Sequence, residues 1–403
     1  MTSTGSLLWR LSCRACCNDV DPDRPTGVCP TCGQALFAEY DLEHLDPRRW
    51  LAALPARARS LWRYRELLPV RDDRHIATLG EGGSPILDLG EISAAPGIRV
   101  LEKDDGGLPT GSFKARGMAV AVSRARELGL EELFVPSAGN AGVALAAYGA
   151  RAGRRVRVYL PEQAPASIAE AARTFGAEVI ALPGTLREVG AAARQAERAR
   201  SAFDLSTLRE PYRVEGKKTM GFEIFEELGA DALPDAILYP TGGGTGLIGM
   251  WRAFRTLRSL GLLERIPRLY AIQPEGCAPV VRALDDGATQ VAGWDEPRTL
   301  APGLLVPAPF AGERILEAIR ESGGGGIRVT DRSILGAMRQ LGDRHGISAS
   351  PEAAAPYAAL PALVERRAIR GGETVLLYGT GTGLGFSIPT LERSLEGGTG
   401  TGR

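Results

Sequence analysis

The sequence predicts an α/β fold with two parallel-sheet αβα domains, a cleft between them, and a small N-terminal segment. Two observations support this fold class. From residue 98 onward, short runs of β-branched and apolar residues alternate with longer helical periods. Such alternation is typical of βαβ units, whose strands lie parallel in one sheet. The second observation is size, because 403 residues are enough for two or three domains.

The individual elements follow from this alternation. The predicted strands are Ile98–Leu101, Leu133–Val135, Val156–Leu160, Ala177–Ala181, Ala236–Tyr239, Leu269–Gln273 and Val375–Tyr378. The predicted helices cover 114–128, 140–152, 166–175, 185–201 and about 246–259. The glycine run Gly323–Gly326 predicts a flexible loop.

The order of these elements suggests a division of the chain. We expect a ribbon-like segment at 1–42, a connector and the start of the larger domain at 43–98, a smaller α/β domain at 99–210, a larger α/β domain at 211–395, and a disordered tail at 396–403. No internal repeat is present in the sequence.

Composition excludes several classes of function. The 48 basic and 48 acidic residues give a net charge of zero, so we expect neither a nucleic-acid partner nor a membrane-surface partner. No apolar run approaches the roughly 18 residues of a membrane span. The first residues, MTSTGSLLWRLSC, do not form a secretory signal, which predicts a cytoplasmic protein.

Four of the six cysteines have the spacing of metal ligands. Cys13 and Cys16 form one CxxC pair, Cys29 and Cys32 form another, and twelve residues separate the pairs. Two such pairs can supply the four thiolates of a tetrahedral zinc site, whose closed ligand set predicts a structural role. Cys17 could compete as a ligand, and the alternative is a ribbon that folds without metal.

Lys114 is the first candidate for chemistry. It follows a Gly-Ser turn in the stretch PTGSFKARG and opens a helical period. The N-terminus of a helix is electropositive, so an amine there gives up its proton more readily, as an amine that attacks a carbonyl carbon must. Most lysines at helix starts are simply solvated or paired with a carboxylate. The catalytic assignment of Lys114 therefore also depends on the loops downstream.

Three further loops each lie at the end of a predicted strand. SAGNAG (Ser137–Gly142) opens a helix and could bind an anion through backbone N–H groups, although it also reads as an ordinary N-cap. TGGGTG (Thr241–Gly246) could cradle a phosphate, yet it is neither a Walker A motif nor a dinucleotide fingerprint. GTGTG (Gly379–Gly383) offers hydroxyls, or is a plain glycine turn.

Together these loops resemble the motifs of fold-type II pyridoxal-phosphate (PLP) enzymes, and most of all the threonine synthase family. GEGGSP (Gly80–Pro85), LEKD (Leu101–Asp104) and PYRVEGKKT (Pro211–Thr219) add to the resemblance, which spans nearly the whole chain. The N-terminal cysteine segment also resembles threonine synthases more than other branches. The family implies a homodimer that acts on a small amino-acid substrate.

The resemblance implies roles for particular residues. Lys114 would hold the cofactor covalently and move a proton at the substrate Cα. Cofactor contacts would come from Phe113, Asn140 (to the ring hydroxyl), Gly242, Gly243, Gly244, Thr245 and Gly246 (to the phosphate) and Thr380 (to the ring nitrogen, with Thr382 as competitor). Ser137, Ala138 and Gly139 would hold the substrate carboxylate. Lys218, or its neighbour Lys217, would hold a substrate phosphate.

The main hypothesis is therefore a PLP-dependent lyase that converts O-phospho-L-homoserine to L-threonine and phosphate, by γ-elimination and addition of water at Cβ. Three departures from the family keep an alternative open: Ala115 replaces an aspartate, Gly242–Gly244 lacks an asparagine, and Gly385–Phe386 replaces Lys-Asp. The alternative is a threonine or serine ammonia-lyase or a β-replacement enzyme. A third hypothesis, a non-catalytic zinc-ribbon binding protein, conflicts with the intact loops.

Overall fold

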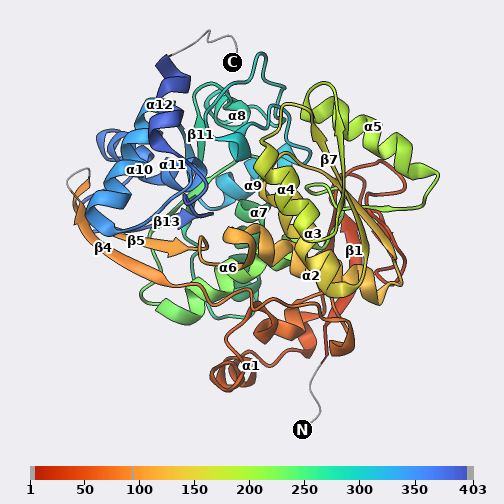
Figure 1. The fold of residues 1–403 in the computed structure, drawn as a ribbon. Helices are drawn as coiled ribbons and strands as arrows, with labels where there is room; N and C mark the ends of the chain where they lie inside the picture. Colours follow the sequence, from red (N-terminus) through yellow and green to blue (C-terminus); the bar gives the residue numbers. More distant parts are fainter. Residues whose placement is uncertain (1–4, 93–94, 397–403) are drawn as a thin grey trace. The chain divides into compact units, whose positions relative to one another are not determined.

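The computed structural model describes residues 5–92 and 95–396 (Figure 1). The tail predicted for 396–403 lies outside the described residues, apart from Glu396. The chain forms two compact units. Unit 1 comprises Met1–Gly83, Leu108–Gly221 and Ser259–Leu262, and unit 2 comprises Ser84–Gly107, Phe222–Arg258 and Leu263–Arg403. The domain boundaries expected from the sequence stay a prediction.

Unit 1 begins with a small antiparallel sheet. Its strands are β1 (Leu8–Cys13), β2 (Asp19–Val20) and β3 (Leu36–Tyr40), in the order β2-β1-β3. Leu11 and Leu36 are fully buried, which gives this sheet an apolar face. The short helix α1 (Pro47–Ala53) and several 3-10 turns follow, and Asp46 caps α1 through the N–H groups of Arg48 and Arg49.

The second sheet of unit 1 is parallel throughout. It contains β6 (Glu132–Pro136), β7 (Arg155–Pro161), β8 (Glu178–Leu182) and β9 (Phe203–Asp204), in the order β8-β7-β6-β9. Its helices are α2 (Lys114–Glu127), α3 (Asn140–Ala152), α4 (Ala166–Thr174) and α5 (Leu186–Arg198), and α6 (Arg213–Leu228) runs across the division into unit 2.

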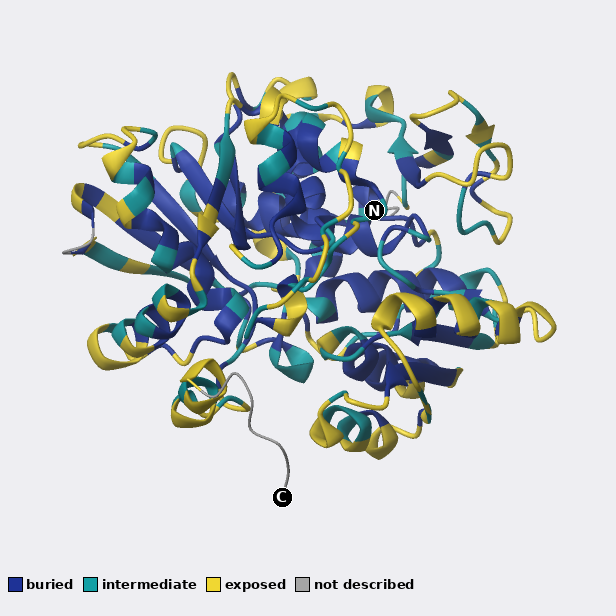
Figure 2. Ribbon diagram, turned by 90° about the horizontal axis from the view of Figure 1, so that it is seen from above, coloured by how far each residue is buried: buried dark blue, intermediate teal, exposed yellow. Residues whose placement is uncertain are grey.

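Successive side chains of β6 face opposite layers of unit 1. Leu133 and Val135 join the core that contains residues of α2, α3 and α4, whereas Phe134 packs with Val189 and Ala193 of α5. This period of two is what a strand buried on both faces requires. The result is the αβα layering that the sequence predicted. The inner strands β6 and β7 are mostly buried, whereas the edge strand β8 is exposed or half-buried (Figure 2 shows buried residues in dark blue).

The sheet of unit 2 has six strands. They are β4 (Ile86–Ile92), β5 (Ala95–Asp104), β10 (Ala236–Pro240), β11 (Arg268–Pro274), β12 (Gly325–Val329) and β13 (Thr374–Gly379), in the order β12-β11-β10-β13-β5-β4. All pairs are parallel except β4 with β5. The expectation of a flexible loop at Gly323–Gly326 was wrong in part, because Gly325 and Gly326 pair with Tyr270 and Ala271 in the sheet.

The helices of unit 2 are α7 (Thr245–Ser259), α8 (Pro279–Asp285), α9 (Gly312–Glu321), α10 (Asp331–His345), α11 (Pro351–Glu365) and α12 (Ile388–Glu396). Residues of α10 and α11 form one core with the apolar side chains of β5, β10 and β13. α8 to α12 were not predicted. Within the described ranges, no helix combines the length and apolarity that crossing a bilayer needs.

Candidate active site

Lys114 is the first residue of α2, as the sequence predicted. Two consecutive residues with positive φ, Thr110 at 61° and Gly111 at 69°, turn the chain just before it. Lys114 is partly buried, and its Nζ lies 3.9 Å from the ring centroid of Phe113. The hydroxyls of Thr110 and Ser112 are buried, with no hydrogen-bond partner in the described chain. Buried polar groups without a partner are rare in native proteins, and both of these lie within four residues of Lys114.

A second amine lies at the same loop. Lys217 is 1% exposed, its Nζ donates a hydrogen bond to the carbonyl oxygen of Phe113, and that Nζ lies 3.9 Å from the Phe113 ring centroid. Lys217 lies at this loop because helices α2 and α6 cross at close distance. A β-carbon at Gly216 of α6 would lie 2.9 Å from Cα of Gly117 in α2, so only glycine fits. Sequence reasoning did not predict this supporting position for Lys217.

The lysine count sets these residues apart. Among 48 basic residues the chain has 44 arginines and only four lysines, Lys103, Lys114, Lys217 and Lys218, all in the described part. Lys103, Lys217 and Lys218 are at most 1% exposed, which leaves Lys114 as the accessible lysine amine. An ammonium group is compact, so carbonyl and carboxylate oxygens can accept its hydrogen bonds within a small buried space. A planar guanidinium group would need more room.

Lys218 does not lie in an open anion site. Its Nζ is paired with Glu215 one turn earlier in α6 and lies 3.8 Å from the ring centroid of Tyr40 in β3. Both charged side chains are buried, so each offsets the cost of burying the other. The substrate-phosphate role assigned to Lys218 from the sequence stays a prediction, and this pairing does not favour it.

The Ser137–Gly139 loop joins β6 to α3. The hydroxyl of Ser137 accepts hydrogen bonds from the N–H groups of Gly139 (3.3 Å) and Gly142 (3.1 Å), and Ser137 is 7% exposed. Ser137 therefore shapes the loop from within. Asn140 is exposed at the first position of α3, and no hydrogen bond in the described chain involves its side-chain amide. This leaves the amide available to a ligand.

The glycine loop joins β10 to α7 in unit 2. No hydrogen bond within the described residues uses the backbone N–H groups of Gly242, Gly243, Gly244 or Thr245. A β-carbon at Gly242 would come within 2.5 Å of the Gly303 carbonyl oxygen, and Gly244 has a φ of 74°. At Gly246 a side chain would collide with the hydroxyl of Tyr239. Positions 242, 244 and 246 therefore require glycine, and the run of unused N–H donors suits a phosphate.

Gln273 fixes the start of that loop. This fully buried side chain donates to the Thr241 carbonyl oxygen (2.9 Å) and accepts from the N–H groups of Val280 (2.9 Å) and Val281 (3.1 Å). It thus ties the loop to the first turn of α8. The sequence contained no signal for this role, because Gln273 ends an ordinary apolar strand.

The last loop follows β13, the direct neighbour of β10. Because these two strands are parallel, the glycine loop and Thr380 lie at the same edge of the sheet. Thr380 is 4% exposed, and no hydrogen bond in the described chain involves its hydroxyl. The residue that follows β5 is hydrogen-bonded to the end of β13, just before this loop. Asp105 N–H donates to the Gly379 carbonyl (2.8 Å), and the Tyr378 hydroxyl donates to the Asp105 carboxylate (3.0 Å).

Glu81, from the GEGGSP stretch, has a structural position in unit 1. Its buried carboxylate accepts from Trp62 Nε1 (2.7 Å), the Tyr148 hydroxyl (2.6 Å) and Leu79 N–H (2.9 Å). Burial, together with the nearby carboxylate, raises the pKa of Tyr148. Glu81 thereby joins the N-terminal connector to α3.

The four predicted zinc ligands lie together, with Cys13 at the end of β1 and the other three outside the strands of the N-terminal sheet. The thiol sulfurs of Cys13, Cys16, Cys29 and Cys32 are all within 4.8 Å of one another. Although burial raises the pKa of the Cys29 thiol, backbone N–H groups of Cys32 and Thr31 and the neighbouring thiols lower it to about 6. Cys17 is exposed and is not a member of this group.

The ribbon is attached to α2 through one arginine. Arg124 is 1% exposed, and its Nη2 donates to the Pro22 carbonyl (2.8 Å) and to the Asp23 carboxylate (2.7 Å). The Tyr212 hydroxyl donates to the same Pro22 carbonyl (3.3 Å). These contacts connect the loop between the two CxxC pairs to the helix that begins with Lys114.

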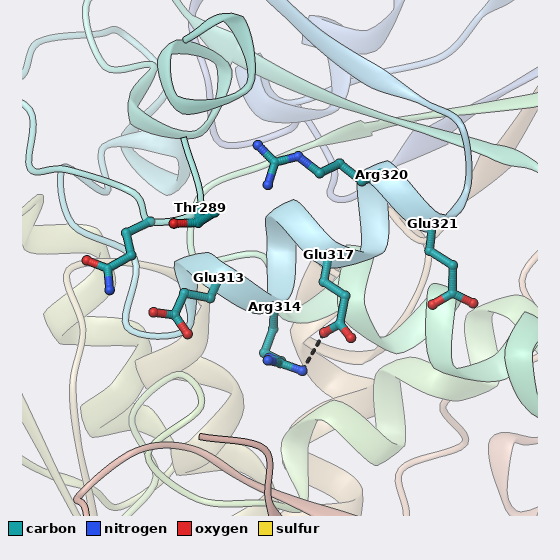
Figure 3. Close-up of a pocket in the computed structure, with 7 residues that line it drawn as sticks. Thr289, Glu313, Arg314, Glu317, Arg320 and Glu321 are labelled. Atoms are coloured by element: carbon teal, nitrogen blue, oxygen red, sulfur yellow. Dashed lines mark ion pairs between the residues drawn. The ribbon is translucent and has the colours of Figure 1, made fainter. Parts of the chain in front are cut away.

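A surface pocket of unit 2 lies elsewhere. It is lined by exposed and half-exposed side chains of α9 and the segment before it, and Arg314 and Glu317 form an ion pair there (Figure 3). None of the predicted catalytic or cofactor-binding residues lines this pocket.

Comparison with known proteins decides the family. The model of the pyridoxal-phosphate-dependent enzymes matches residues 77–381. The chain belongs to this family of pyridoxal-phosphate-dependent enzymes. A threonine synthase of Methanocaldococcus jannaschii is 34% identical over 92% of both chains, and one of Methanosarcina acetivorans is 35% identical over 93% of this chain and 91% of that protein.

A solved structure supports the fold of this PLP-dependent enzyme. Maize serine racemase superposes with a TM-score of 0.67 at 20% identity, covering 78% of this chain and 91% of the racemase. The residues present also fit the cofactor. Unused N–H donors in the glycine loop suit its phosphate, and a partly accessible lysine suits its aldehyde.

Proposed function

We propose that this PLP-dependent enzyme is a lyase that converts O-phospho-L-homoserine to L-threonine and inorganic phosphate. The observation that carries this proposal is the similarity to threonine synthases over more than nine-tenths of the chain, together with a candidate site whose donors are unused. When bound, pyridoxal phosphate supplies an electron sink for the bonds at the substrate Cα.

Most of the predicted residues then have a task. Lys114 would hold the cofactor through its aldehyde and would take and return the proton at the substrate Cα. The N–H groups of Gly242 to Thr245 would hold the cofactor phosphate, and Gln273 keeps their loop in place. Asn140 would contact the ring hydroxyl and Thr380 the ring nitrogen, and the Ser137–Gly139 loop would hold the substrate carboxylate.

The test is a product analysis. Full-length protein loaded with PLP is incubated with O-phospho-L-homoserine, and the products are measured by mass spectrometry and a phosphate assay. Equal amounts of threonine and phosphate are expected. Absence of turnover with this substrate would refute the proposal.

A second function is favoured by Ala115 and by the three-glycine loop, both of which depart from the threonine synthase pattern. It is deamination of threonine or serine, or replacement at Cβ of a related amino acid. Formation of a keto acid and ammonia from L-threonine, without any reaction of O-phospho-L-homoserine, would establish it.

We also propose that the four clustered cysteines bind one zinc ion with a structural role, since four thiolates complete its tetrahedron. A homodimer and a cytoplasmic location remain predictions, which light scattering and cell fractionation would test.

A further inference from the structure

An irregular segment of unit 2 lies against the glycine loop. Between α8 and α9 the described chain is irregular apart from the 3-10 turn Pro302–Leu304. A β-carbon at Gly242 would lie 2.5 Å from the carbonyl oxygen of Gly303 and 3.1 Å from Cγ2 of Val306. Residues 299–306, here called the strap, therefore form a wall of the loop that we assign to the cofactor phosphate. Long irregular segments inside compact domains are usually functional.

The strap is held by two carboxylates, each in the first turn of a helix. The Asp331 carboxylate of α10 accepts hydrogen bonds from the Thr299 hydroxyl (2.6 Å) and the Leu300 N–H (3.1 Å). The Glu352 carboxylate of α11 accepts a hydrogen bond from the Gly303 N–H (2.7 Å). A negative charge is stabilised at a helix N-terminus, because the helix dipole is positive there. Both positions therefore favour a charged hydrogen-bond acceptor.

Glu352 holds the part of the strap that touches the glycine loop. Gly303 donates its N–H to Glu352, and its carbonyl oxygen lies against Gly242. A β-carbon at Gly303 would lie 2.9 Å from Glu352 Oε1, so a side chain there would displace the carboxylate. Asp331 holds only the start of the strap, at residues 299 and 300. Loss of Glu352 would therefore release the strap at the point where it supports Gly242.

The start of α11 also holds the loop that follows β13. Ser350, the N-cap of α11, donates its N–H to the Gly381 carbonyl oxygen (3.1 Å). Gly383 donates its N–H to the Ser348 carbonyl oxygen (2.7 Å). Residues 348–352 therefore contact both the strap and the loop that carries Thr380. They connect the phosphate end of the candidate site to its ring-nitrogen end, within unit 2.

We propose that Glu352 is a positioning residue for the cofactor phosphate, because it fixes the strap against Gly242. This inference rests on the proposed placement of the phosphate at the N–H groups of Gly242 to Thr245. Glu352 acts through Gly303 and needs no contact with the cofactor. Without its carboxylate the Gly303 N–H loses its acceptor, the strap moves more freely, and the glycine loop holds the phosphate less firmly.

The test observes the phosphate directly. Full-length protein is loaded with PLP, and the ³¹P chemical shift of the cofactor is recorded from pH 5.5 to 8.5. This range spans the second ionisation of a free phosphate monoester, whose pKa is about 6. Titration of the cofactor-free protein gives the dissociation constant for PLP.

Three substitutions are compared. Glu352→Ala removes the acceptor, whereas Glu352→Gln keeps an acceptor oxygen without the charge. Glu365→Ala is the matched control, because Glu365 is exposed at the other end of the same helix.

In the native protein and in Glu365→Ala we expect a phosphate shift that does not change with pH, because the N–H groups hold the dianion. Glu352→Ala should raise the PLP dissociation constant about fivefold, the effect of one lost hydrogen bond. Its phosphate shift should move toward that of free PLP and follow pH. Glu352→Gln should stay close to native in both measurements. A native shift and affinity in Glu352→Ala, or a glutamine variant as impaired as the alanine variant, would overturn the proposal.

Melting temperatures of the cofactor-free proteins separate this role from general stabilisation of α11. If Glu352 only stabilises the helix, Glu352→Ala melts earlier and leaves the phosphate shift as it was, which contradicts the proposal. Should the alanine variant not fold, Glu352→Met carries the test, because methionine favours helix but has no oxygen acceptor.

The outcomes also distinguish this inference from the proposed function. A native phosphate shift equal to that of free PLP would refute the placement of the phosphate, and the role of Glu352 with it. A native shift that is unaltered in Glu352→Ala would refute only the role of Glu352. Absence of turnover with O-phospho-L-homoserine would refute the proposed reaction and leave this inference standing, because it concerns the cofactor alone.

Discussion

At the scale of single residues, the candidate site depends on which polar groups have partners. Lys114 is accessible, while the other three lysines are buried against carbonyls or carboxylates. Asn140, Thr380 and the glycine-loop N–H groups have unused hydrogen-bonding capacity in the described chain. Gln273, in contrast, makes three hydrogen bonds, which tie the start of the glycine loop to the first turn of α8.

Replacement of Lys114 by alanine should abolish covalent attachment of PLP and lower turnover by more than about 100-fold, because the variant loses its acid–base amine. Borohydride reduction followed by peptide mass spectrometry should label a single lysine peptide in the native protein and none in the variant. Label on Lys217 or Lys218 would contradict the assignment.

Replacement of Gln273 by leucine should destabilise the protein and weaken PLP binding. It leaves the N–H groups of Val280 and Val281 without an acceptor, at a cost of about 1–3 kcal/mol each. Urea unfolding and PLP titration would measure both effects. The exposed Gln290 is the control, because Gln290→Leu should change neither by more than about 0.5 kcal/mol.

At the scale of elements, the crossing of α2 and α6 positions the lysine loop. The two helices meet at Gly117 and Gly216, which brings Lys217 against the carbonyl of Phe113. The PYRVEGKKT stretch is therefore a packing motif in this structure. Lys217 donates a hydrogen bond to the carbonyl oxygen of Phe113, and Lys218 forms an ion pair with the carboxylate of Glu215.

Replacement of Gly216 by alanine should cost about 1–3 kcal/mol, because the new methyl group would collide with the backbone of Arg116 and force the helices apart. Covalent PLP attachment should slow at the same time. The control is Gly336→Ala in α10, where nothing lies within 4 Å of the added carbon. That variant should gain up to about 1 kcal/mol, and equal effects of the two substitutions in thermal unfolding would disprove the crossing argument.

At the scale of the whole molecule, the N-terminal ribbon is part of unit 1. Arg124 of α2 and Tyr212 both bond to Pro22, which lies between the two cysteine pairs. A metal ion that holds the two cysteine pairs together would therefore also hold in place the loop between them, which contacts α2.

Removal of zinc with a chelator, or the variant Cys13→Ser, should lower the melting temperature, because the four thiolates lose the ion that holds the ribbon. Elemental analysis should find one zinc per chain in the native protein and in Cys17→Ser, whose sulfur lies outside the cluster. Loss of zinc from Cys17→Ser would show that the ligand set is wrong.

The sequence by itself determined the fold class, twelve of the elements within a few residues, the position of the motif loops at strand–helix junctions and the four clustered cysteines. These features are local, because periodicity, capping and glycine content act over a few neighbouring residues. The tertiary structure alone decided the antiparallel edge strand β4, the strand at Gly325–Val329, the hydrogen bonds by which Gln273 holds the glycine loop, and the place of Lys217. Each of these features depends on a contact with a residue far away in sequence. Neither segment by itself shows that the contact will form or how much it stabilises the fold.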